Sequence, residues 1–357
     1  MSVFNNVHLR DHEAVVFGCD RAAGLRAIIA IHNTSRGAAL GGCRMWAYES
    51  EEQALTDVLR LSRAMTYKSA LAELPLGGGK AVIIADPRRD KTETLLRAMG
   101  RFIDSLGGHY ITAEDSGTGV QDLKVMARET KHVAGIADRQ DADGNWHSAD
   151  PSPATAYGVL VGIKASVQEH LGRGDLEGMR IAIQGLGHVG WCLAHHLRAA
   201  GARLWVTDIL PETRERAAAE LDARVVEPEA IYTQAVDVFA PCALGAVLND
   251  QTIAQLQARV VAGSANNQLA DDHHGEMLWR RGILYAPDYV INAGGVIDLA
   301  HELGGYDPSQ ARSHIARIAD TLIEIYRRAH RTGSPTNRVA DDIAEERFQL
   351  RRSVAAA

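Results

Sequence analysis

Apolar and polar positions alternate in a way that divides the first 137 residues into short strands and longer helices. Three apolar runs have the length of buried strands, at 26–32, 82–85 and 110–113. Two amphipathic helices are predicted where apolar residues recur with a period near 3.6, at 54–65 and 95–106. Ser50 predicts the start of the first helix, because Gln53 three residues later completes a capping box. The helix then carries Lys68 at its carboxyl end.

The second half of the chain repeats a strand-then-helix pattern, which is typical of a parallel sheet. Its predicted strands are the apolar runs at 179–184, 204–207, 236–240, 259–263 and 282–285. A long amphipathic helix at 312–331 follows the last strand, and a shorter helix is predicted within 334–352.

A polar stretch with four Asp, one Gly and two Pro separates the two halves at 138–153. It lacks apolar periodicity, so we interpret it as the linker between two domains. The first domain is predicted to span 1–137 and the second 151–331. The helix within 334–352 is expected to return to the first domain. The sequence assigns no role to the polar residues 138–150.

The composition excludes several classes of protein. A length of 357 residues suits two domains, and contents of 46% hydrophobic and 23% charged residues are ordinary for a globular protein. No apolar run approaches the roughly 18 residues of a membrane span, and the first residues lack a signal-peptide pattern. A formal net charge of −7 argues against a nucleic-acid partner. We therefore expect a cytoplasmic protein, not associated with membranes, whose partners are small molecules.

Cysteine and histidine patterns predict no metal site. The four cysteines are scattered, with neither a CxxC pair nor zinc spacing, and are expected to be reduced. Two histidine pairs, His195-His196 and His273-His274, are adjacent in sequence rather than spaced as in HExxH. Because adjacent residues on a helix point to different faces, neither pair is expected to chelate, and no metal is assigned.

The strand at 179–184 runs directly into the turn Gly185-Leu186-Gly187-His188-Val189-Gly190. This GxGxxG pattern precedes a helix, a second strand and then Asp208, which is the order of a dinucleotide-binding unit. The glycines would let a pyrophosphate reach the helix N-terminus. Asp208 would accept hydrogen bonds from a ribose 2′-hydroxyl and repel a 2′-phosphate. The pattern predicts a Rossmann-type domain that binds NAD through these residues, with a chance glycine-rich turn as the alternative.

Lys80 directly follows three glycines, and Lys68 precedes it by twelve residues. The run is not a P-loop, because Leu74 takes the place of the first required glycine and Ala81 that of the metal-binding Ser or Thr. The glycines instead predict a tight entry into the strand 82–85, with Lys80 at the strand mouth. Apolar walls there would lower the pKa of the lysine and suit it to catalysis. A surface lysine after a flexible turn is the alternative.

Asp115 follows the strand 110–113 in an acidic, glycine-rich turn. The two lysines and this carboxylate all stand at the ends of predicted elements, so they can share one cleft. Such a cleft would bind a carboxylate substrate and keep one group for acid/base chemistry. An acid at a strand end often caps the next helix instead, and Glu114 or Asp122 fits that position equally well.

Gly41 and Gly42 form a second glycine site, directly after Leu40. The pair fits a close approach of the backbone to a ligand, and a plain β-turn fits equally. Three asparagines lie after predicted strands, where parallel sheets bind ligands or where turns form: Asn266, Asn267 and Asn292. Spacing alone does not choose between these interpretations.

Beyond these features, the sequence resembles the amino-acid dehydrogenases that act on glutamate, leucine, phenylalanine and valine, and is most similar to the leucine-type bacterial members. The resemblance runs from about Val15 to about Arg347. It rests on the stretches ALGGCRMW, MTYKSALAELPLGGGKAVII, YITAEDSGTG, DPSPATAYGV, APCALGAVLND, AGSANNQL and APDYVINAGGVI.

The resemblance implies an α/β fold with an N-terminal substrate domain and a Rossmann-type, doubly wound NAD-binding domain, separated by an active-site cleft. It implies the reversible, NAD-dependent oxidative deamination of an L-amino acid to its 2-oxo acid and ammonium. It also implies a homo-oligomer, from a dimer to an octamer. The oligomeric state and the physiological direction stay open.

The resemblance also implies roles for single residues. Lys68 would bind the substrate carboxylate, Lys80 would polarise the attacking water, and Asp115 would exchange protons with the amine. The substrate would be seated by Gly41, Gly42 and Asn266. The nicotinamide half of the cofactor would be contacted by Thr155 and Asn292, and Cys242, which follows the strand 236–240, is included in the predicted cofactor site.

The pocket walls of the family correspond to Leu40, Met65, Ala113, Ile291 and Val296 of this chain. Leucine-type members resemble it in carrying Ala and Val at positions 113 and 296, whereas aromatic-type members tend towards Gly and Leu. A methyl group at Ala113 would shorten the pocket where a ring would go. We therefore expect a branched-chain substrate (Leu, Val or Ile), although the exact preference stays open.

An aromatic amino-acid dehydrogenase, for Phe or Trp, is the alternative within the family. Outside it, a dinucleotide sensor without catalytic activity and a 2-hydroxy-acid dehydrogenase are alternatives on the same fold. The presence of both lysines and Asp115 disfavours the sensor, and turnover without ammonium would indicate the hydroxy-acid enzyme.

Overall fold

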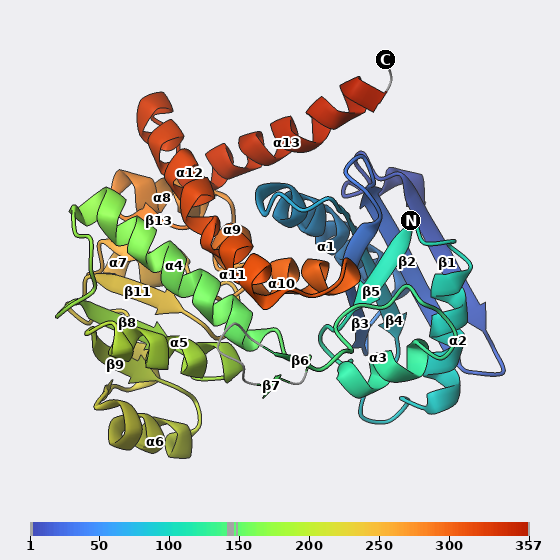
Figure 1. Cartoon of the computed structure of the whole chain (residues 1–357), viewed down its shortest axis with the longest axis horizontal. Helices are drawn as coiled ribbons and strands as arrows, with labels where there is room; N and C mark the ends of the chain where they lie inside the picture. Colours follow the sequence, from blue (N-terminus) through green and yellow to red (C-terminus); the bar gives the residue numbers. More distant parts are fainter. Residues whose placement is uncertain (1–2, 141–145, 148, 356–357) are drawn as a thin grey trace. The chain divides into compact units, whose positions relative to one another are not determined.

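The computed structural model describes residues 3–140, 146–147 and 149–355, and the chain forms two compact units (Figure 1). Unit 1 combines the residues up to Asp150 with Leu299–Pro308 and the residues from Ala344 onward. Unit 2 combines Pro151–Asp298 with Ser309–Ile343. The chain therefore passes between the units more than once.

Unit 1 is built on a five-stranded mixed sheet with the order β1-β2-β4-β3-β5. β4 lies antiparallel to β2 and parallel to β3, and β5 lies parallel to β3. Its strands are β1 (Ala14–Asp20), β2 (Leu25–Asn33), β3 (Ala39–Trp46), β4 (Gly77–Ile84) and β5 (Tyr110–Ala113), and it also contains η1 (Val3–Asn5), α1 (Glu51–Leu71), α2 (Glu93–Asp104) and α3 (Val120–Met126).

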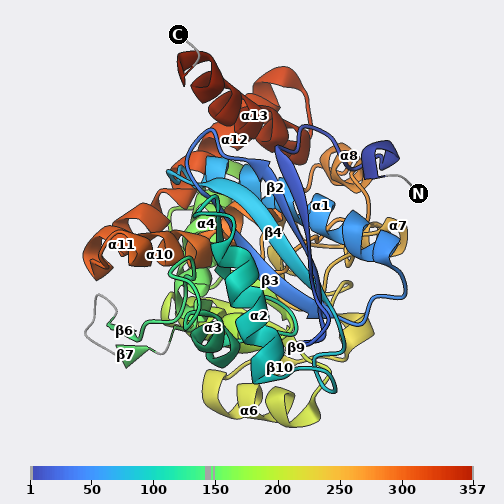
Figure 2. The same ribbon diagram turned by 90° about the vertical axis from the view of Figure 1, so that its right-hand side faces the viewer.

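Alternating side chains on these strands face two separate apolar clusters, one on each side of the sheet. In β2, Ile28 belongs to the cluster that includes α1, whereas Ile29 belongs to the cluster that includes α2 and α3. In β4, Val82 belongs to the α1 cluster and Ala81 to the other. Figure 2 shows α1 and α2 on opposite faces of this sheet. By the same alternation, Lys80 points to the α1 side of the sheet.

The three glycines before Lys80 lie inside β4, so the predicted entry turn at the mouth of a strand 82–85 is wrong. The glycines are required by packing. A Cβ on Gly77 would lie 1.9 Å from the carbonyl oxygen of Asn33, and one on Gly78 would lie 2.0 Å from the backbone nitrogen of Thr66. The absence of side chains therefore lets helix α1 pack directly against β4.

Gly41 and Gly42 lie inside strand β3, so the β-turn interpretation is also wrong. A Cβ on Gly41 would lie 1.8 Å from the carbonyl oxygen of Gly79 in β4. A Cβ on Gly42 would lie 2.8 Å from the Cβ of Asp115. The glycine pair makes room for the neighbouring strand and for the carboxylate.

Unit 2 is built on a six-stranded parallel sheet with the order β10-β9-β8-β11-β12-β13. Numbered from the first strand of the unit, this is the order 3-2-1-4-5-6 of a doubly wound dinucleotide-binding sheet. The order in which successive strands are added to the sheet reverses between β8 and β11, and such sheets bind their ligands at this point. The strands are β8 (Arg180–Gln184), β9 (Arg203–Thr207), β10 (Arg224–Val225), β11 (Val238–Pro241), β12 (Val260–Val261) and β13 (Leu284–Tyr285).

Helices cover this sheet and extend the chain beyond it (Figure 1). They are α4 (Ser152–Leu171), α5 (His188–Ala199), α6 (Pro211–Leu221), η2 (Pro228–Ala230), α7 (Asp250–Gln255), α8 (His273–Arg280), α9 (Asp288–Ile291), α10 (Gly294–Leu303), α11 (Pro308–Ala316), α12 (Ile318–Thr332) and α13 (Thr336–Ala355). The single helix predicted at 312–331 is interrupted at Arg317, whose backbone N–H donates to His314, three residues back. The last helix, α13, ends at Ala355, beyond the predicted end at residue 352.

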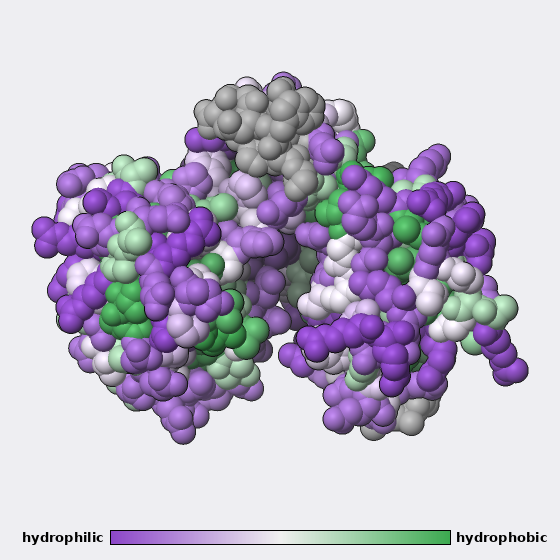
Figure 3. Space-filling model, turned by 90° about the horizontal axis from the view of Figure 1, so that it is seen from below, coloured by the Kyte–Doolittle hydropathy of each residue, from purple (hydrophilic) through white to green (hydrophobic). Residues whose placement is uncertain are grey.

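The polar segment between the halves contains two short antiparallel strands, β6 (Arg139–Gln140) and β7 (Trp146–His147). Residues 141–145 and 148 of the predicted linker lie outside the described residues. Among the described helices, none is both long and apolar enough to cross a membrane. Hydrophilic residues cover most of the surface in the view of Figure 3.

Candidate functional site

Unit 1 brings two of the predicted catalytic residues into direct contact. The ammonium group of Lys80 donates a hydrogen bond to Oδ2 of Asp115, and the two side chains form an ion pair. Only 6% of the Lys80 side chain and 16% of the Asp115 side chain are exposed. Buried charges are tolerated when they are paired and hydrogen-bonded, so each of these groups depends on the other.

The turn after β5 fixes the Asp115 carboxylate. Oδ1 accepts hydrogen bonds from the backbone N–H of Ser116 at 2.7 Å and from Nε of Arg44 at 2.8 Å. The hydroxyl of Thr118 donates to the carbonyl of Cys43 at 2.6 Å and ties the turn to β3. Both carboxylate oxygens of Asp115 therefore accept hydrogen bonds, Oδ2 from Lys80 and Oδ1 from Ser116 and Arg44.

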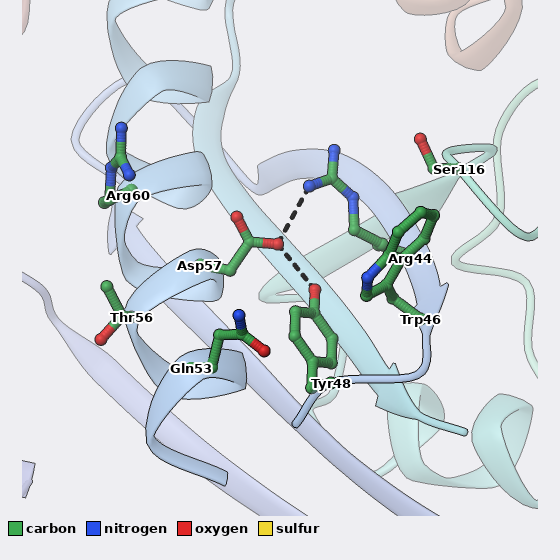
Figure 4. Close-up of a pocket in the computed structure, with 8 residues that line it drawn as sticks. All are labelled: Arg44, Trp46, Tyr48, Gln53, Thr56, Asp57, Arg60 and Ser116. Carbon is green, nitrogen blue, oxygen red and sulfur yellow. Dashed lines mark hydrogen bonds and ion pairs between the residues drawn. The ribbon is translucent and has the colours of Figure 1, made fainter. Parts of the chain in front are cut away.

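Arg44 joins Asp115 to a second carboxylate. Its NH1 donates to Oδ2 of Asp57 at 2.9 Å, and the hydroxyl of Tyr48 donates to the same oxygen at 2.6 Å (Figure 4). Asp57 comes from helix α1 and Arg44 from strand β3. The chain of contacts thus runs from Tyr48 through Asp57 and Arg44 to Asp115 and Lys80.

A pocket of about 440 Å³ opens on the Tyr48 side of this chain of contacts. Its walls include Arg44 and Ser116, which both bind Asp115, but neither Asp115 nor Lys80 itself. Trp46, with 54% of its surface exposed, and Arg60 also line it. The pocket therefore borders the supporting contacts rather than the Lys80–Asp115 pair.

The charges around Asp115 keep it ionised. Burial alone would raise the pKa of this carboxyl, but the charges of Lys80 and Arg44 and their hydrogen bonds outweigh burial and lower the pKa from 3.8 to about 2. The pKa of Arg44 is raised by Asp115 and Asp57 although burial opposes that shift. Near neutral pH the structure therefore contains an ionised Asp115 with cationic neighbours.

The remaining predicted substrate residues of unit 1 lie on the elements around this pair. Lys68 occupies the last turn of α1, two residues after the position where Thr66 meets Gly78 of β4. Met65 is half-buried on the same helix. Leu40 in β3 and Ala113 at the end of β5 are buried. The close contact between α1 and β4 therefore fixes the position of Lys68 relative to β4, the strand that carries Lys80.

In unit 2, the glycine-rich turn lies at the reversal point of the sheet, between β8 and α5. Gly185 has a φ of +96°, and a Cβ there would lie 2.6 Å from Ala243. A Cβ on Gly190 would lie 2.1 Å from the carbonyl oxygen of Gly185, so α5 packs closely on the strand. Gly187 faces open space and, with His188, is exposed, while Val189 is half-buried. The open side at Gly187 leaves the amino end of α5 accessible to an anion.

Asp208 stands at the carboxyl end of β9 beside this turn. Its Oδ2 accepts from the backbone N–H of Leu186 at 2.7 Å, and its Oδ1 accepts from that of Leu210 at 2.9 Å. A carboxylate has about four acceptor positions, so both oxygens keep capacity for a ribose hydroxyl. Cys242 also lies near the turn, because a Cβ on Gly190 would be 3.3 Å from its Cβ.

Asn292 and Asn266 form a polar contact in unit 2. The amide nitrogen of Asn292 donates to Oδ1 of Asn266 at 2.8 Å and to the carbonyl of Ser264 at 3.1 Å. Oδ1 of Asn292 is buried and has no hydrogen-bond partner within the described part of the chain. An unsatisfied buried acceptor is costly, and a donor such as a carboxamide N–H would satisfy it. With the open glycine turn, these residues fit a bound dinucleotide.

Thr155 and the two remaining pocket residues also belong to unit 2. A Cβ on Gly295 would lie 2.6 Å from the Thr155 hydroxyl oxygen, so α4 and α10 meet there. Ile291 is fully buried, and a Cβ on Gly162 would lie 2.5 Å from it, whereas Val296 is half-buried. These residues and those of the Lys80 site belong to different units.

Sequence reasoning missed Arg44, Asp57 and Tyr48. One signal for Arg44 was available, because residues two apart on a strand share a face, and Gly42 and Arg44 have this spacing in β3. No spacing rule connects Asp57 with Arg44, since they lie on different elements.

Comparisons with known proteins agree with this architecture. A sequence model described as "Glu/Leu/Phe/Val dehydrogenase, dimerisation domain" matches residues 12–132, and one described as "Glutamate/Leucine/Phenylalanine/Valine dehydrogenase" matches residues 206–334. The chain is 52% identical over 352 residues to leucine dehydrogenase of Geobacillus stearothermophilus, which spans 99% of this chain and 95% of that protein.

Aromatic enzymes of the same group are also similar. The chain is 47% identical over 349 residues to L-tryptophan dehydrogenase of Nostoc punctiforme, spanning 98% of this chain and 96% of that protein. The crystal structure of L-tryptophan dehydrogenase from Nostoc punctiforme superimposes with a TM-score of 0.86 at 45% identity, covering 98% of this chain and 100% of that one.

Proposed function

The chain belongs to the glutamate/leucine/phenylalanine/valine dehydrogenase family, and on that premise we propose that it catalyses the NAD-dependent, reversible oxidative deamination of a branched-chain L-amino acid to its 2-oxo acid and ammonium. The observation that carries this proposal is the buried Lys80–Asp115 pair, which unites a cation with a potential proton acceptor. The leucine dehydrogenases at 51% and 52% identity support a branched-chain substrate.

Lys80 supplies a positive charge where the reaction develops a negative one. When water adds to the imine carbon of the oxidised substrate, its oxygen loses a proton and passes through a partly anionic state. An ammonium group with 6% of its side chain exposed stabilises such an oxygen strongly, because little solvent screens it. Lys68, at the end of α1, provides a second cation for the substrate carboxylate.

Asp115 moves the protons of the amine. It begins the reaction as a carboxylate, because its pKa in the free enzyme is about 2. The leaving amine must gain a proton, and the carboxyl can deliver one that it has first accepted from the substrate. A substrate that separates Asp115 from Lys80 would raise the pKa of the carboxyl and bring it closer to that of a useful acid/base.

The cofactor is proposed to be NAD, held by Gly185, Gly187 and Gly190 with Asp208 on the adenosine ribose. His188, Val189 and Cys242 border the same turn, and Thr155 and Asn292 are proposed to contact the nicotinamide half. When bound, the nicotinamide accepts the hydride from the substrate Cα. Asp208 favours NAD over NADP because a carboxylate repels a 2′-phosphate.

Substrate choice is proposed to depend on Leu40, Met65, Ala113, Ile291 and Val296, with Gly41, Gly42 and Asn266 seating the polar end. A single methyl group in such a pocket discriminates by about 1–3 kcal/mol, so Leu, Val and Ile should all be accepted. A homo-oligomer is proposed as well, since the family description of residues 12–132 names a dimerisation domain.

The direct test is reductive amination, following the oxidation of NADH with ammonium and matched 2-oxo acids. The 2-oxo acid of leucine should turn over faster than those of phenylalanine and tryptophan, and NADH faster than NADPH. Omitting ammonium is the control and should abolish turnover. Preference for an aromatic acid would keep the reaction and overturn the branched-chain assignment, whereas turnover without ammonium would overturn the reaction itself.

Replacing Lys80 tests its role separately. Lys80→Ala should lower kcat by about 100–1,000-fold or more, which is the effect of removing one group that stabilises transition-state charge. NADH binding should stay near normal, because the dinucleotide residues lie in unit 2. Lys91→Ala is the matched control, since Lys91 pairs with Asp122 at 2.8 Å in the same unit. Turnover of Lys80→Ala close to that of the control would end the assignment.

A further inference from the structure

Two histidines and an aspartate, side chains of kinds that can ligate metal ions, converge at the start of helices α7 and α8 in unit 2, which lie side by side (Figures 1 and 2). Nε2 of His274 lies 3.7 Å from Oδ1 of Asp250, and Nε2 of His273 lies 3.8 Å from the same oxygen. The two imidazole rings are 4.0 Å apart between centroids. The sequence-based argument that adjacent histidines face apart is therefore wrong for this pair.

His274 provides the observation that points to a ligand. It is 4% exposed, and its Nε2 is buried with no hydrogen-bond partner in the described structure. Its other ring nitrogen is engaged by the backbone of Asp271, with the N–H at 2.9 Å and the carbonyl at 3.1 Å. Whichever tautomer is present, Nε2 stays unsatisfied, which is costly for a buried polar atom. A cation on Nε2 would satisfy it and select the tautomer that donates from Nδ1 to the carbonyl, with loss of the hydrogen bond from the Asp271 N–H.

The surroundings orient both imidazoles and fix the backbone that carries Asp250. Nδ1 of His273 lies 2.6 Å from Oδ1 of Asp271 and donates a hydrogen bond to it. In this tautomer Nε2 carries the lone pair that can bind a metal. A carboxylate behind a ligating imidazole is a common support in metal sites. Asp250 is placed by the capping interactions of Asn249 at the start of α7 and by the bridge between Leu248 and Leu269. The ligand atoms thus belong to a fixed backbone rather than to a mobile loop.

From this geometry we propose that Asp250, His273 and His274 bind one divalent transition-metal ion, with Zn²⁺ as the physiological candidate. Two imidazoles and a carboxylate are ligands that suit zinc and its neighbours. Ligands about 2.0 Å from a tetrahedral ion are roughly 3.3 Å apart, so the gaps of 3.7 and 3.8 Å between the Asp250 carboxylate and the two imidazoles need to close by about half an ångström. A water molecule would complete the coordination.

The ion would stabilise the segment that precedes α8, which includes Gln268 and Ala270. Leu248 exchanges backbone hydrogen bonds with this segment, donating to Gln268 at 2.9 Å and accepting from Ala270 at 3.0 Å. A metal that links Asp250 to the two histidines closes the same connection through side chains. The helix N-termini disfavour a cation, and the carboxylates of Asp250 and Asp271 offset that effect. The proposal does not depend on which reaction the enzyme catalyses.

The test is Zn²⁺ binding to the full chain, measured by calorimetry after treatment with a chelator and under reducing conditions. Wild type should bind one ion per chain and melt at a higher temperature with Zn²⁺. Asp250→Asn and His273→Asn both replace exposed ligands, so the variants should fold and bind at least about 100-fold more weakly. Asp271→Asn removes the negative charge behind His273 but keeps an oxygen that can accept its hydrogen bond, and it should weaken binding by about 10–100-fold.

Asp272→Asn is the matched control, because Asp272 is an exposed neighbour outside the cluster and its variant should bind like wild type. Co²⁺ provides an independent readout, since four-coordinate Co²⁺ has strong visible absorption that Asp250→Asn should abolish. Absence of binding to wild type would overturn the proposal. Equal binding to wild type and Asp250→Asn would overturn it as well, by showing that the ion sits elsewhere.

Discussion

Arg44 is the residue on which the geometry of Asp115 depends. Its guanidinium binds Asp115 at 2.8 Å through Nε and Asp57 at 2.9 Å through NH1. The planar guanidinium group carries several N–H donors and can bind two carboxylates at once, whereas the single ammonium group of a lysine cannot bind both in the same geometry. Arg44 therefore acts through Asp115 as a positioning residue.

Arg44→Met should lower kcat by about 100-fold, which is the effect of a small misplacement of a reacting group. KM for the 2-oxo acid should change little, because Lys68 and Lys80 remain. Loss of the nearby charge should also raise the pKa of Asp115 and move the acidic limb of the kcat/KM profile to higher pH. Arg44→Lys should recover only part of kcat.

Arg60→Met is the control for this prediction, because Arg60 lines the same pocket without a bond to Asp57 (Figure 4). It should leave both kcat and the pH profile near those of wild type. An unchanged acidic limb in Arg44→Met would show that the arginine only supports the fold.

The pKa of Asp115 also predicts how stability depends on pH. The folded value of about 2 lies below the ordinary 3.8, so ionisation favours the folded state above pH 3.8 and this stabilisation is lost as the pH falls towards 2. The contribution is about 2 kcal/mol at neutral pH. Denaturant unfolding at neutral pH and near pH 3 should show a smaller loss of stability in Asp115→Asn than in wild type. Equal losses would contradict the assigned shift.

At this scale the sequence predicted that Lys80 and Asp115 come together, but it did not predict the residues that support them. Asp115 could be recognised because it follows a strand, where parallel sheets bind their ligands, and Lys80 because it follows three glycines, although its place inside β4 was not predicted. The partner of Arg44 could not be recognised, since Asp57 and Arg44 meet only after α1 packs across β3. Gly42 is a similar case, because the need for glycine arises from Asp115 on another element.

At the scale of elements, the contact between α1 and β4 determines where Lys68 stands. The helix comes so close that the backbone nitrogen of Thr66 occupies the space of a side chain at Gly78. Glycine in a strand weakens its intrinsic preference and is typical of loops, which is why the first five residues of β4, 77–81, were not predicted as strand. The start of α1, in contrast, followed a local signal, the Ser50 cap, whose side chain accepts from Gln53 N–H at 3.1 Å.

Gly78→Ala should separate α1 from β4. A Cβ there would lie 2.0 Å from a backbone nitrogen, so the helix must shift, at a cost of about 1–3 kcal/mol in the free energy of unfolding. The shift should displace Lys68 and raise KM for the 2-oxo acid. Gly119→Ala is the control, because nothing lies within 4 Å of a Cβ at that position. Equal stability of the two variants would contradict the packing argument.

At the scale of the whole molecule, the fold of unit 2 depends on a segment that follows an excursion into unit 1. The chain leaves unit 2 after Asp298 and returns at Ser309. Helix α12 then packs against α4, where the hydroxyls of Tyr326 and Ser166 lie 2.7 Å apart. The alternating pattern of the second half predicted the parallel sheet, but nothing local to α12 shows that it completes the core of that sheet's unit.

Fragments of the chain test this dependence. A fragment of residues 151–343 keeps α12 and should fold and bind NADH without catalysing turnover, because Lys80 and Asp115 lie in unit 1. A fragment of residues 151–298 lacks Leu322 and Ile325, which are fully buried in the complete chain, so it should lose cooperative thermal unfolding. The intervening residues 299–308 would form a loop, which costs little because closure entropy grows slowly with length. Cooperative unfolding and equal NADH affinity in the shorter fragment would show that α12 covers unit 2 without stabilising it.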